Sequence, residues 1–328
     1  MAKISVLGAG GWGMALALSA FKCGHEVVIW SAFESEVNAL RETRTNERLL
    51  PGIELPKGIL VTGDINDIEG SQITIIAVPS VAVREIARLL SKQQNYGIVV
   101  NVAKGFEKGS LKLLSEVICE ELGENVRFAV LSGPSHAEEV ARNIPTSVVA
   151  TSKSLTVAGV VQDMLSSDDL RIYTSNDVIG VELGGALKNV IAICAGFCDG
   201  MGLGDNTKAA LITRGIAEMA RLGVCMGARE MTFAGLTGIG DLVVTCTSRH
   251  SRNNRFGFKV GSGMAVEDAL REVGTVEGYY AALMAYELSR KYKIDMPIVT
   301  ECYGVLYEGN SITNMVKNLM TRPKKTEN

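Results

Sequence analysis

A short turn rich in glycine near the start of the chain restricts its fold more than any other feature. Gly8-Ala9-Gly10-Gly11-Trp12-Gly13 follows an apolar run that begins at Ile4, and it precedes an apolar stretch with helical spacing. This strand–turn–helix context with G-x-G-x-x-G spacing is typical of a βαβ unit that binds a dinucleotide. Gly8 permits the tight turn, Gly10 lets a pyrophosphate approach the backbone, and Gly13 allows close packing of helix on strand. A glycine-rich turn without a ligand is the alternative.

The first half of the chain alternates short β-branched runs with helical spacing, which indicates further βαβ units and a parallel sheet. The expected strands are Ile4–Leu7, Glu26–Trp30, Ile73–Val78, Ile98–Val102, Phe128–Leu131, Ser147–Ala150 and Ile172–Thr174. The expected helices are Gly11–Cys23, Glu34–Arg44, Val81–Leu90, Leu111–Leu122 and Thr156–Leu165. Several strands are almost wholly apolar, as strands covered on both faces should be.

The strand pattern ends near Asp177, and the remaining chain has helical spacing almost to its end. The helices expected there are Val178–Cys198, Lys208–Met226, Val266–Arg271, Tyr279–Tyr292, Val299–Tyr307 and Ile312–Met320. A chain of 328 residues suits two domains better than one core. The expected fold is therefore α/β: a Rossmann-like, doubly wound domain over residues 1–177 that binds the dinucleotide, followed by an all-helical domain over residues 178–328 that binds substrate and carries catalysis.

Composition and charge exclude several classes of protein. The formal net charge of -3 gives no basic face for a nucleic acid. Arg322, Lys324 and Lys325 form a basic cluster in the C-terminal tail, which indicates a solvated end. The seven cysteines have neither C-x-x-C nor zinc-type spacing, which predicts a reducing, cytoplasmic compartment and no metal site.

The apolar runs are shorter than a membrane span; Ala186–Cys198, for example, contains Lys188 and Asn189. We therefore expect a small-molecule substrate as the partner, with neither a membrane nor a nucleic acid. A homodimer is compatible with the sequence.

The residues after the second strand bear on the choice of cofactor. The strand ends at Trp30 without the acidic residue that often binds the ribose of NAD, and without an arginine for the 2′-phosphate of NADP. Phe33 is a candidate to stack on adenine and Glu34 to reach the ribose, and both are equally compatible with a helix start. Because no cation is present, the sequence slightly favours NAD over NADP.

Two lysines are the candidates for acid–base chemistry. Lys104 follows the strand Ile98–Val102, at the edge where ligands bind in doubly wound sheets. Lys188 lies among small and apolar residues in Glu182–Ile191, where an ammonium group needs a partner. A structural lysine that extends its charge to solvent is the alternative for Lys188.

Several stretches carry a resemblance to a known family: Gly8–Gly13, Asn101–Gly105, Gly133–Glu139, Val181–Asn189, Gly202–Lys208, Phe233–Cys246 and Ser251–Arg255. They closely resemble the bacterial type of NAD(P)-dependent glycerol-3-phosphate dehydrogenase. The runs Val181–Val190 and Gly238–Leu242 are quite specific to this family. The resemblance spans the chain and implies reversible hydride transfer between NAD(P)H and dihydroxyacetone phosphate, giving sn-glycerol 3-phosphate for phospholipid synthesis.

The resemblance also implies roles for single residues in catalysis. Lys188 matches the lysine that protonates the substrate carbonyl oxygen, and Lys104 matches a second lysine at the substrate. Asn189, Asp241 and Thr245 match polar groups around the substrate. A hydride that arrives at C2 leaves an alkoxide, so an ammonium group in this place has the right chemistry.

The residues expected to bind substrate and cofactor overlap. Those for the substrate are Lys104, Gly133, Ser135, Lys188, Asp241, Ser251, Arg252 and Asn253, of which Arg252 and Asn253 match a phosphate-binding pair. Those for the cofactor are Gly8, Gly10, Gly11, Trp12, Gly13, Phe33, Lys104, Ala137, Arg252, Thr275 and Glu277. Members of this family often have serine at the position of Gly11 and a basic residue after the second strand. This chain has Gly11 and Ser31-Ala32-Phe33 instead, and both differences argue against a preference for NADP.

Three alternatives accompany this interpretation. The arginines between residues 249 and 255 are also compatible with an ordinary solvated loop. A β-hydroxyacid or 6-phosphogluconate-type dehydrogenase would share the domain plan, but the pair Arg252-Asn253 and the run Gly238–Leu242 argue against it. A cofactor-binding sensor without catalysis would have no need of both Lys104 and Lys188.

Overall fold

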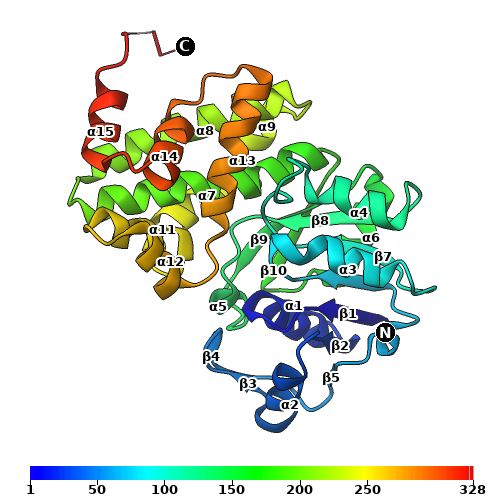
Figure 1. Cartoon of the computed structure of the whole chain (residues 1–328). Helices are drawn as coiled ribbons and strands as arrows, with labels where there is room; N and C mark the ends of the chain where they lie inside the picture. Colours follow the sequence, from blue (N-terminus) through cyan, green and yellow to red (C-terminus); the bar gives the residue numbers. More distant parts are fainter. Residues whose placement is uncertain (325, 328) are drawn as a thin grey trace. The chain divides into compact units, whose positions relative to one another are not determined.

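The computed structural model describes residues 1–324 and 326–327, so that Lys325 of the expected basic tail lies outside the described residues. The chain divides into two compact units, Met1–Glu182 and Leu183–Asn328. The first unit is built on an eight-stranded sheet, and the described residues of the second form helices and connecting turns (Figure 1). The expected order, a Rossmann-like α/β part followed by a helical part, is confirmed.

The strand order places the glycine-rich turn at the centre of the sheet. The strands are β1 (Lys3–Leu7), β2 (Glu26–Trp30), β3 (Thr45–Asn46), β4 (Leu50–Glu54), β5 (Leu60–Thr62), β6 (Ile73–Ile76), β7 (Ile98–Asn101), β8 (Phe128–Ser132), β9 (Thr146–Thr151) and β10 (Leu170–Ser175). The sheet runs β10-β9-β8-β7-β6-β1-β2-β5, and β3 pairs with β4 alone. The part from β5 to β8 has the 3-2-1-4-5-6 order of dinucleotide-binding folds.

The sheet differs from the expected parallel one at a single pairing. β9 is antiparallel to β8, whereas the other pairs of the large sheet are parallel. A parallel pair needs a crossover that carries the chain back along the sheet, usually a helix. The link from β8 to β9 contains only the four-residue helix α5 (Ala137–Val140), which is too short for that return.

Strands β3, β4 and β5 were not expected from the sequence. β3 and β5 have two and three residues. β4 contains Pro51 and Gly52, which are rare inside strands. Such segments give no alternating pattern; β3 and β4 form a local antiparallel pair, and β5 is defined by its pairing with the distant strand β2.

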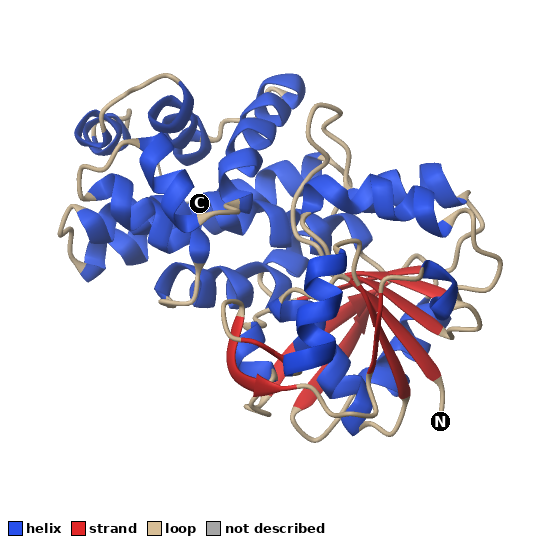
Figure 2. Cartoon of the chain, turned by 60° about the horizontal axis from the view of Figure 1, so that its bottom comes forward, coloured by secondary structure: helices blue, strands red, loops and turns tan. Residues whose placement is uncertain are grey.

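Helices cover both faces of the twisted sheet (Figure 2). One face packs against α1 (Gly11–Lys22), α2 (Glu34–Thr43) and α6 (Leu155–Leu165). The opposite face packs against the short helix η1 (Ile65–Ile68), α3 (Val83–Leu90) and α4 (Leu114–Leu122), while η2 (Ser80–Ala82) leads into α3. Along β1, Ile4 and Val6 belong to the first core and Leu7 to the second, as strand alternation requires.

The helices of the second half follow α7 (Val178–Gly200), which contributes residues to both units. They are α8 (Asp205–Cys225), α9 (Glu230–Phe233), the π-helical turn η3 (Leu236–Gly240), α10 (Asp241–Thr247), α11 (Arg252–Gly261), α12 (Val266–Val273), α13 (Glu277–Tyr292), α14 (Pro297–Tyr307) and α15 (Ile312–Met320). The expected helices are confirmed within a few residues at their ends. The elements from α9 to α11 were not expected, since glycine and polar residues interrupt the helical spacing there.

Helix α7 corrects one expectation. Among the described residues it is the one helix long and apolar enough to cross a membrane, whereas every apolar run of the sequence was expected to be too short. In its most apolar window, 94% of the residues are buried inside the structure. Its apolar composition therefore fits the core helix of the fold.

Each unit contains a buried glutamate that caps a helix of another segment. Glu182 accepts hydrogen bonds from the backbone N–H of Ser115 at 2.9 Å and from its hydroxyl, at the start of α4. Glu218 of α8 accepts the N–H groups of Ile298 at 2.8 Å and Val299 at 3.2 Å, at the start of α14. These N–H groups have no partner inside their own helices, so the glutamates satisfy them. Burial raises the pKa of both carboxyl groups to about 7.

Glu218→Gln should flatten the pH dependence of stability. The folded-state pKa of about 7 lies above the ordinary value of 4.5. The folded state therefore binds this proton more tightly, and the stabilisation is lost as the pH rises from 4.5 through 7. One proton gives a slope of at most about 1.4 kcal/mol per pH unit. The Tm measured by circular dichroism should fall less between about pH 5 and 8 in the variant. Parallel Tm profiles would contradict this role of Glu218.

Candidate active site

The glycine-rich turn is closed in by backbone on several sides. Gly8 has a φ of +121°, and its N–H donates to the carbonyl of Trp30 at 2.8 Å. A Cβ at Gly8 would lie 2.4 Å from the carbonyl oxygen of Ala77, and one at Gly13 would lie 2.1 Å from that of Gly8. The end of β1 is thus pressed against the ends of β2 and β6 and the start of α1. No larger residue fits at Gly8 or Gly13.

The same turn is open at Gly10, where an added Cβ would meet no described heavy atom within 4 Å. Gly10 is the N-cap of α1, and among the described residues no side chain caps this helix end or places an acidic group in its first turn. The N–H groups of a helix start attract anions. An open backbone surface at the switch point of the sheet fits the pyrophosphate of a dinucleotide.

Gly11 differs from its neighbours because a distant loop packs on it. A Cβ there would lie 2.7 Å from the carbonyl oxygen of Leu49 and 3.8 Å from the Cβ of Ala137. A side chain at Gly11 would therefore require this loop to move. Ala137, a candidate cofactor residue, begins α5 beside this turn, and Trp12 is partly buried against the core.

The segment after β2 begins a helix. Phe33 is the N-cap residue of α2, and 70% of it is exposed, while Glu34 is the first residue of the helix. The hydroxyl of Ser31 accepts the N–H of Phe33 at 3.2 Å and donates to Glu36. Ser31 is therefore used in the local turn, and Phe33 presents its ring to solvent near the end of β2.

Lys104 lies at the predicted edge of the sheet, together with two other candidates. It follows β7, and its Nζ donates to the carbonyl of Gly133 at 2.9 Å. The hydroxyl of Ser135 donates to the same oxygen at 3.0 Å. Because β7 and β8 are adjacent and parallel, their carboxyl ends bring these residues together. The ammonium group of Lys104 is thereby held at a fixed place.

Lys188 is buried with two of the predicted residues. Its Nζ donates to Asp241 Oδ1 and to Thr245 Oγ1, both at 2.6 Å. Only 7% of the lysine side chain and 1% of the aspartate side chain are exposed. Asp241 and Thr245 are one turn apart on α10, so both face α7. The alternative of a lysine that extends to solvent is wrong.

Cys246 is a further titratable group near this cluster. Burial raises the pKa of its thiol to about 12, although the charge of Lys188 acts in the opposite direction. The thiol therefore stays protonated near neutral pH.

The start of α11 forms a second cluster of predicted residues. The hydroxyl of Ser251 caps the helix by accepting the N–H of Asn254 at 3.2 Å. Asn253 is buried; its amide donates to Asn189 Oδ1 and accepts the N–H of Gly278, each at 2.9 Å. From Arg252 onward this segment is helix α11 rather than a loop, although Arg252 and Arg255 are solvated, as that alternative expected. Arg252 itself is exposed on the first turn.

The two remaining candidates are near this cluster in sequence. Glu277 begins α13 and precedes Gly278, whose N–H bonds Asn253. Thr275 is exposed in the turn before α13. The chain thus brings Glu277 beside the start of α11, while Thr275 lies at the surface.

Several residues that place these side chains were not expected from the sequence. A Cβ at Gly184 would lie 2.3 Å from the carbonyl oxygen of Thr237, so η3 touches the backbone of α7 just before Asp241. Thr237, Gly278 and Asn254 were not singled out. The signal for them is weak: Asn254 follows three residues after a serine that can cap a helix, and Gly184 is a glycine inside a helix.

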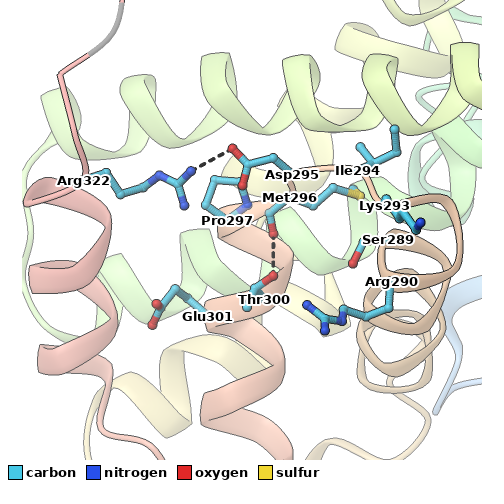
Figure 3. Close-up of a pocket in the computed structure, with 10 residues that line it drawn as sticks. All are labelled: Ser289, Arg290, Lys293, Ile294, Asp295, Met296, Pro297, Thr300, Glu301 and Arg322. Carbon is cyan, nitrogen blue, oxygen red and sulfur yellow. Dashed lines mark hydrogen bonds and ion pairs between the residues drawn. The ribbon is translucent and has the colours of Figure 1, made fainter.

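A hollow of about 610 Å³ lies on the second unit (Figure 3). It is lined by Ser289, Arg290, Lys293, Ile294, Asp295, Met296, Pro297, Thr300, Glu301 and Arg322. Arg322 pairs with Asp295 at 2.7 Å, so this part of the expected solvated tail is engaged. The lining contains none of the predicted site residues. Among residues 1–324 and 326–327, no group of three or more His, Cys, Asp or Glu is arranged to hold a metal ion.

Comparison with known proteins gives a consistent result. Residues 3–158 match the family model described as the NAD-dependent glycerol-3-phosphate dehydrogenase N-terminus, and residues 177–317 match the corresponding C-terminus. The chain is 53% identical over its whole length to a glycerol-3-phosphate dehydrogenase [NAD(P)+] of Desulfitobacterium hafniense, covering 93% of that protein.

Solved structures agree. A glycerol-3-phosphate dehydrogenase from Coxiella burnetii is 38% identical, with a TM-score of 0.93, over 98% of this chain and 99% of that one. A D-mandelate dehydrogenase, 13% identical with a TM-score of 0.64 over 93% of this chain and 97% of that one, shares the fold alone.

Asp241→Ala should destabilise the helical unit, because it leaves a buried ammonium group without its carboxylate. Removing one partner of a buried ion pair costs about 3–5 kcal/mol, whereas replacing both by apolar groups is often neutral. We expect a clear loss of urea stability in Asp241→Ala, and near-normal stability in the double variant Lys188→Met/Asp241→Leu. Equal losses in both variants would show that the pair does not control stability.

Proposed function

Since the chain belongs to the NAD-dependent glycerol-3-phosphate dehydrogenase family, we propose that it catalyses reversible hydride transfer between NAD(P)H and dihydroxyacetone phosphate, giving sn-glycerol 3-phosphate. One observation in the helical unit carries this proposal. A buried ammonium group, Lys188, is held by Asp241 and Thr245, and its neighbour Asn189 bonds the first turn of the helix that presents Arg252. A proton donor and a phosphate-binding cation are the two groups that this substrate requires.

We assign cofactor binding to residues 1–177 and substrate binding with catalysis to residues 178–328. Gly8, Gly10, Gly11 and Gly13 would form the cradle for the pyrophosphate, with Trp12, Phe33 and Ala137 around it. Lys104, Arg252, Thr275 and Glu277 would complete the cofactor site. When bound, NADH or NADPH supplies a hydride to the ketone carbon, and the absence of a cation after Trp30 favours NADH.

Lys188 is the proposed general acid. As the ketone is reduced, its carbonyl oxygen gains negative charge, and Lys188 Nζ donates a proton to it. The carboxylate of Asp241 balances the charge of the buried ammonium group, and Thr245 fixes its direction. Burial keeps water away from the proton being transferred. General acid catalysis of this kind contributes about 10²- to 10⁴-fold.

Lys104 is proposed to contact the substrate as a second amine, held in place by the carbonyl of Gly133. Gly133 and Ser135 would contribute contacts at the carboxyl end of β8. Asn189 and Ser251 complete the polar lining in the helical unit.

Arg252 and Asn253 are the proposed phosphate site. A guanidinium group offers a planar fork that matches two phosphate oxygens, which a lysine does not. Asn253 is already fixed by Asn189 and Gly278, so Arg252 extends from a rigid first turn. Binding the unreactive phosphate holds the ketone in position for reduction.

We infer a cytoplasmic location, with the product used in phospholipid synthesis and with no nucleic acid or membrane as partner. The cysteines among the described residues are free thiols, as expected in a reducing compartment. A homodimer is compatible with this function.

Lys188→Ala should reduce kcat by about 10²-fold or more, because the developing alkoxide loses its proton donor. NADH binding, measured by fluorescence titration, should persist. Lys259→Ala, which removes a lysine of a surface ion pair with Glu272, is the matched control and should retain wild-type turnover. Near-normal turnover in a folded Lys188→Ala variant would remove Lys188 from acid catalysis.

Arg252→Ala should lower activity toward the phosphorylated substrate much more than activity toward its unphosphorylated analogue. Losing one partner of a charge pair costs about 2–5 kcal/mol, or roughly 30- to several-thousand-fold. We expect kcat/KM for dihydroxyacetone phosphate to fall by this factor, and kcat/KM for unphosphorylated dihydroxyacetone to change little. NADH oxidation followed at 25 °C would measure both. Arg252→Lys should recover only part of the loss.

Arg271→Ala, which removes an exposed arginine of α12, is the control for loss of positive charge. It should leave both substrates unaffected. Small and equal losses for both substrates in Arg252→Ala would contradict the phosphate assignment. No NADH oxidation by the wild-type protein would favour a cofactor sensor.

A further inference from the structure

The side chain of Arg252 is not held in place by contacts of its own. Among the described residues, no hydrogen bond or ion pair is found for its guanidinium group, and the side chain is exposed. Its place is therefore set by the backbone of the first turn of α11. Any group that fixes this turn therefore also fixes the guanidinium group of Arg252, which binds the phosphate in the proposed function.

The other three side chains of this turn point inward. Ser251 caps the helix, and Asn253 bonds Asn189 and Gly278, as described above. Asn254 makes a third connection: its Nδ2 donates to the carbonyl oxygen of Cys246 at 3.0 Å and to Asp199 Oδ2 at 3.2 Å. The turn is thus tied to the ends of α10 and α7 as well as to α13.

Asp199 is in turn paired with another helix. Its Oδ1 forms an ion pair with Lys208 on the first turns of α8. The side chains of Asp199 and Lys208 are 28% and 21% exposed, so water screens the pair only in part. The connected side chains of Lys208, Asp199 and Asn254 therefore link α8 and α7 to the turn that carries Arg252.

The backbones of α7 and α11 are closely packed next to these side chains. A Cβ at Gly196 of α7 would lie 2.2 Å from the carbonyl oxygen of Asn254, and one at Gly257 of α11 would lie 2.1 Å from that of Ile193. The two helices touch through glycines at this place. Small shifts of Asn254 are therefore transmitted to the helix as a whole rather than absorbed by side chains.

We propose that Asn254, Asp199 and Lys208 are positioning residues for substrate phosphate recognition: they hold the first turn of α11, and through it Arg252, without touching the substrate. This inference rests on the proposed function of Arg252. A misplacement of about 1 Å in a positioning group can cost 10²-fold in rate. The network thus accounts for how an exposed arginine is directed without a bond of its own.

The test uses the ratio of kcat/KM for dihydroxyacetone phosphate to kcat/KM for dihydroxyacetone, measured with NADH on the full-length enzyme. Asn254→Ala removes both inward bonds, and alanine has the highest helix propensity, so α11 should persist. We expect the ratio to fall by about 10- to 100-fold, mainly through KM for the phosphorylated substrate. Asp199→Ala should lower the ratio in the same direction.

The double variant Asn254→Ala/Asp199→Ala separates positioning from a general structural effect. If Asp199 acts only through Asn254, the ratio in the double variant should equal that of Asn254→Ala. The matched control is Glu272→Ala, which breaks the ion pair at the other end of α11 and should leave the ratio unchanged. Circular dichroism melting checks that each variant is folded.

The outcomes are distinct. A fall of the ratio in Arg252→Ala but not in Asp199→Ala overturns the network alone. Additive falls in the double variant also overturn it, because Asp199 would then act by another route. An unchanged ratio in Arg252→Ala overturns both the phosphate site and its positioning. If Asn254→Ala does not fold, Asp199→Ala decides alone, since Asp199 is partly exposed.

Discussion

The helical unit depends on how closely its segments approach the backbone of α7. Gly184 and Gly196 on α7, and Gly257 and Gly278 on its neighbours, are places where a Cβ would lie between 2.1 and 2.5 Å from a backbone oxygen. These contacts leave no room for adjustment, so η3, α11 and α13 each have one position along the helix. Lys188 and Asn189 lie on the same helix between two of these contacts. The positions of Lys188 and Asn189 are therefore a consequence of backbone packing.

Burial then determines how the polar groups behave. The Lys188–Asp241 pair is nearly inaccessible to water, and Thr245 supplies a further hydrogen bond. In such surroundings an unpaired charge is very unfavourable, so the three groups specify one arrangement. The same reasoning applies to Glu182 and Glu218, whose carboxyl pKa values are raised to about 7 by burial although each accepts two hydrogen bonds. These buried polar groups adopt one arrangement because other arrangements would leave them without hydrogen-bond partners.

In the first unit, glycine serves both to pack the backbone closely and to leave part of it open. At Gly8 and Gly13, glycine allows the end of β1 to be enclosed by β2, β6 and α1, whereas at Gly10 it leaves the backbone open. One turn is thus rigid on the side of the protein and accessible on the side of a ligand. Gly11 shows that the surrounding loops matter as well, because the carbonyl of Leu49 occupies the space that a side chain would need.

Local sequence patterns were sufficient for the order of the main elements, for the glycine turn, for Lys104 at a strand end and for the need of Lys188 for a partner. Each of these follows from a short segment and its periodicity. β3, β4 and α11 were not accessible in this way, because β3 and β4 are short or contain proline and glycine, and polar residues interrupt the helical spacing of α11. The antiparallel orientation of β9 and the strand β5 were not accessible either, because they are defined by pairing with other segments. The same holds for the choice of Asp241 and Thr245 as partners of Lys188, of Asn189 as partner of Asn253, and of Asp199 as partner of Asn254. A sequence determines which groups must be satisfied, whereas only the packed chain decides which groups satisfy them.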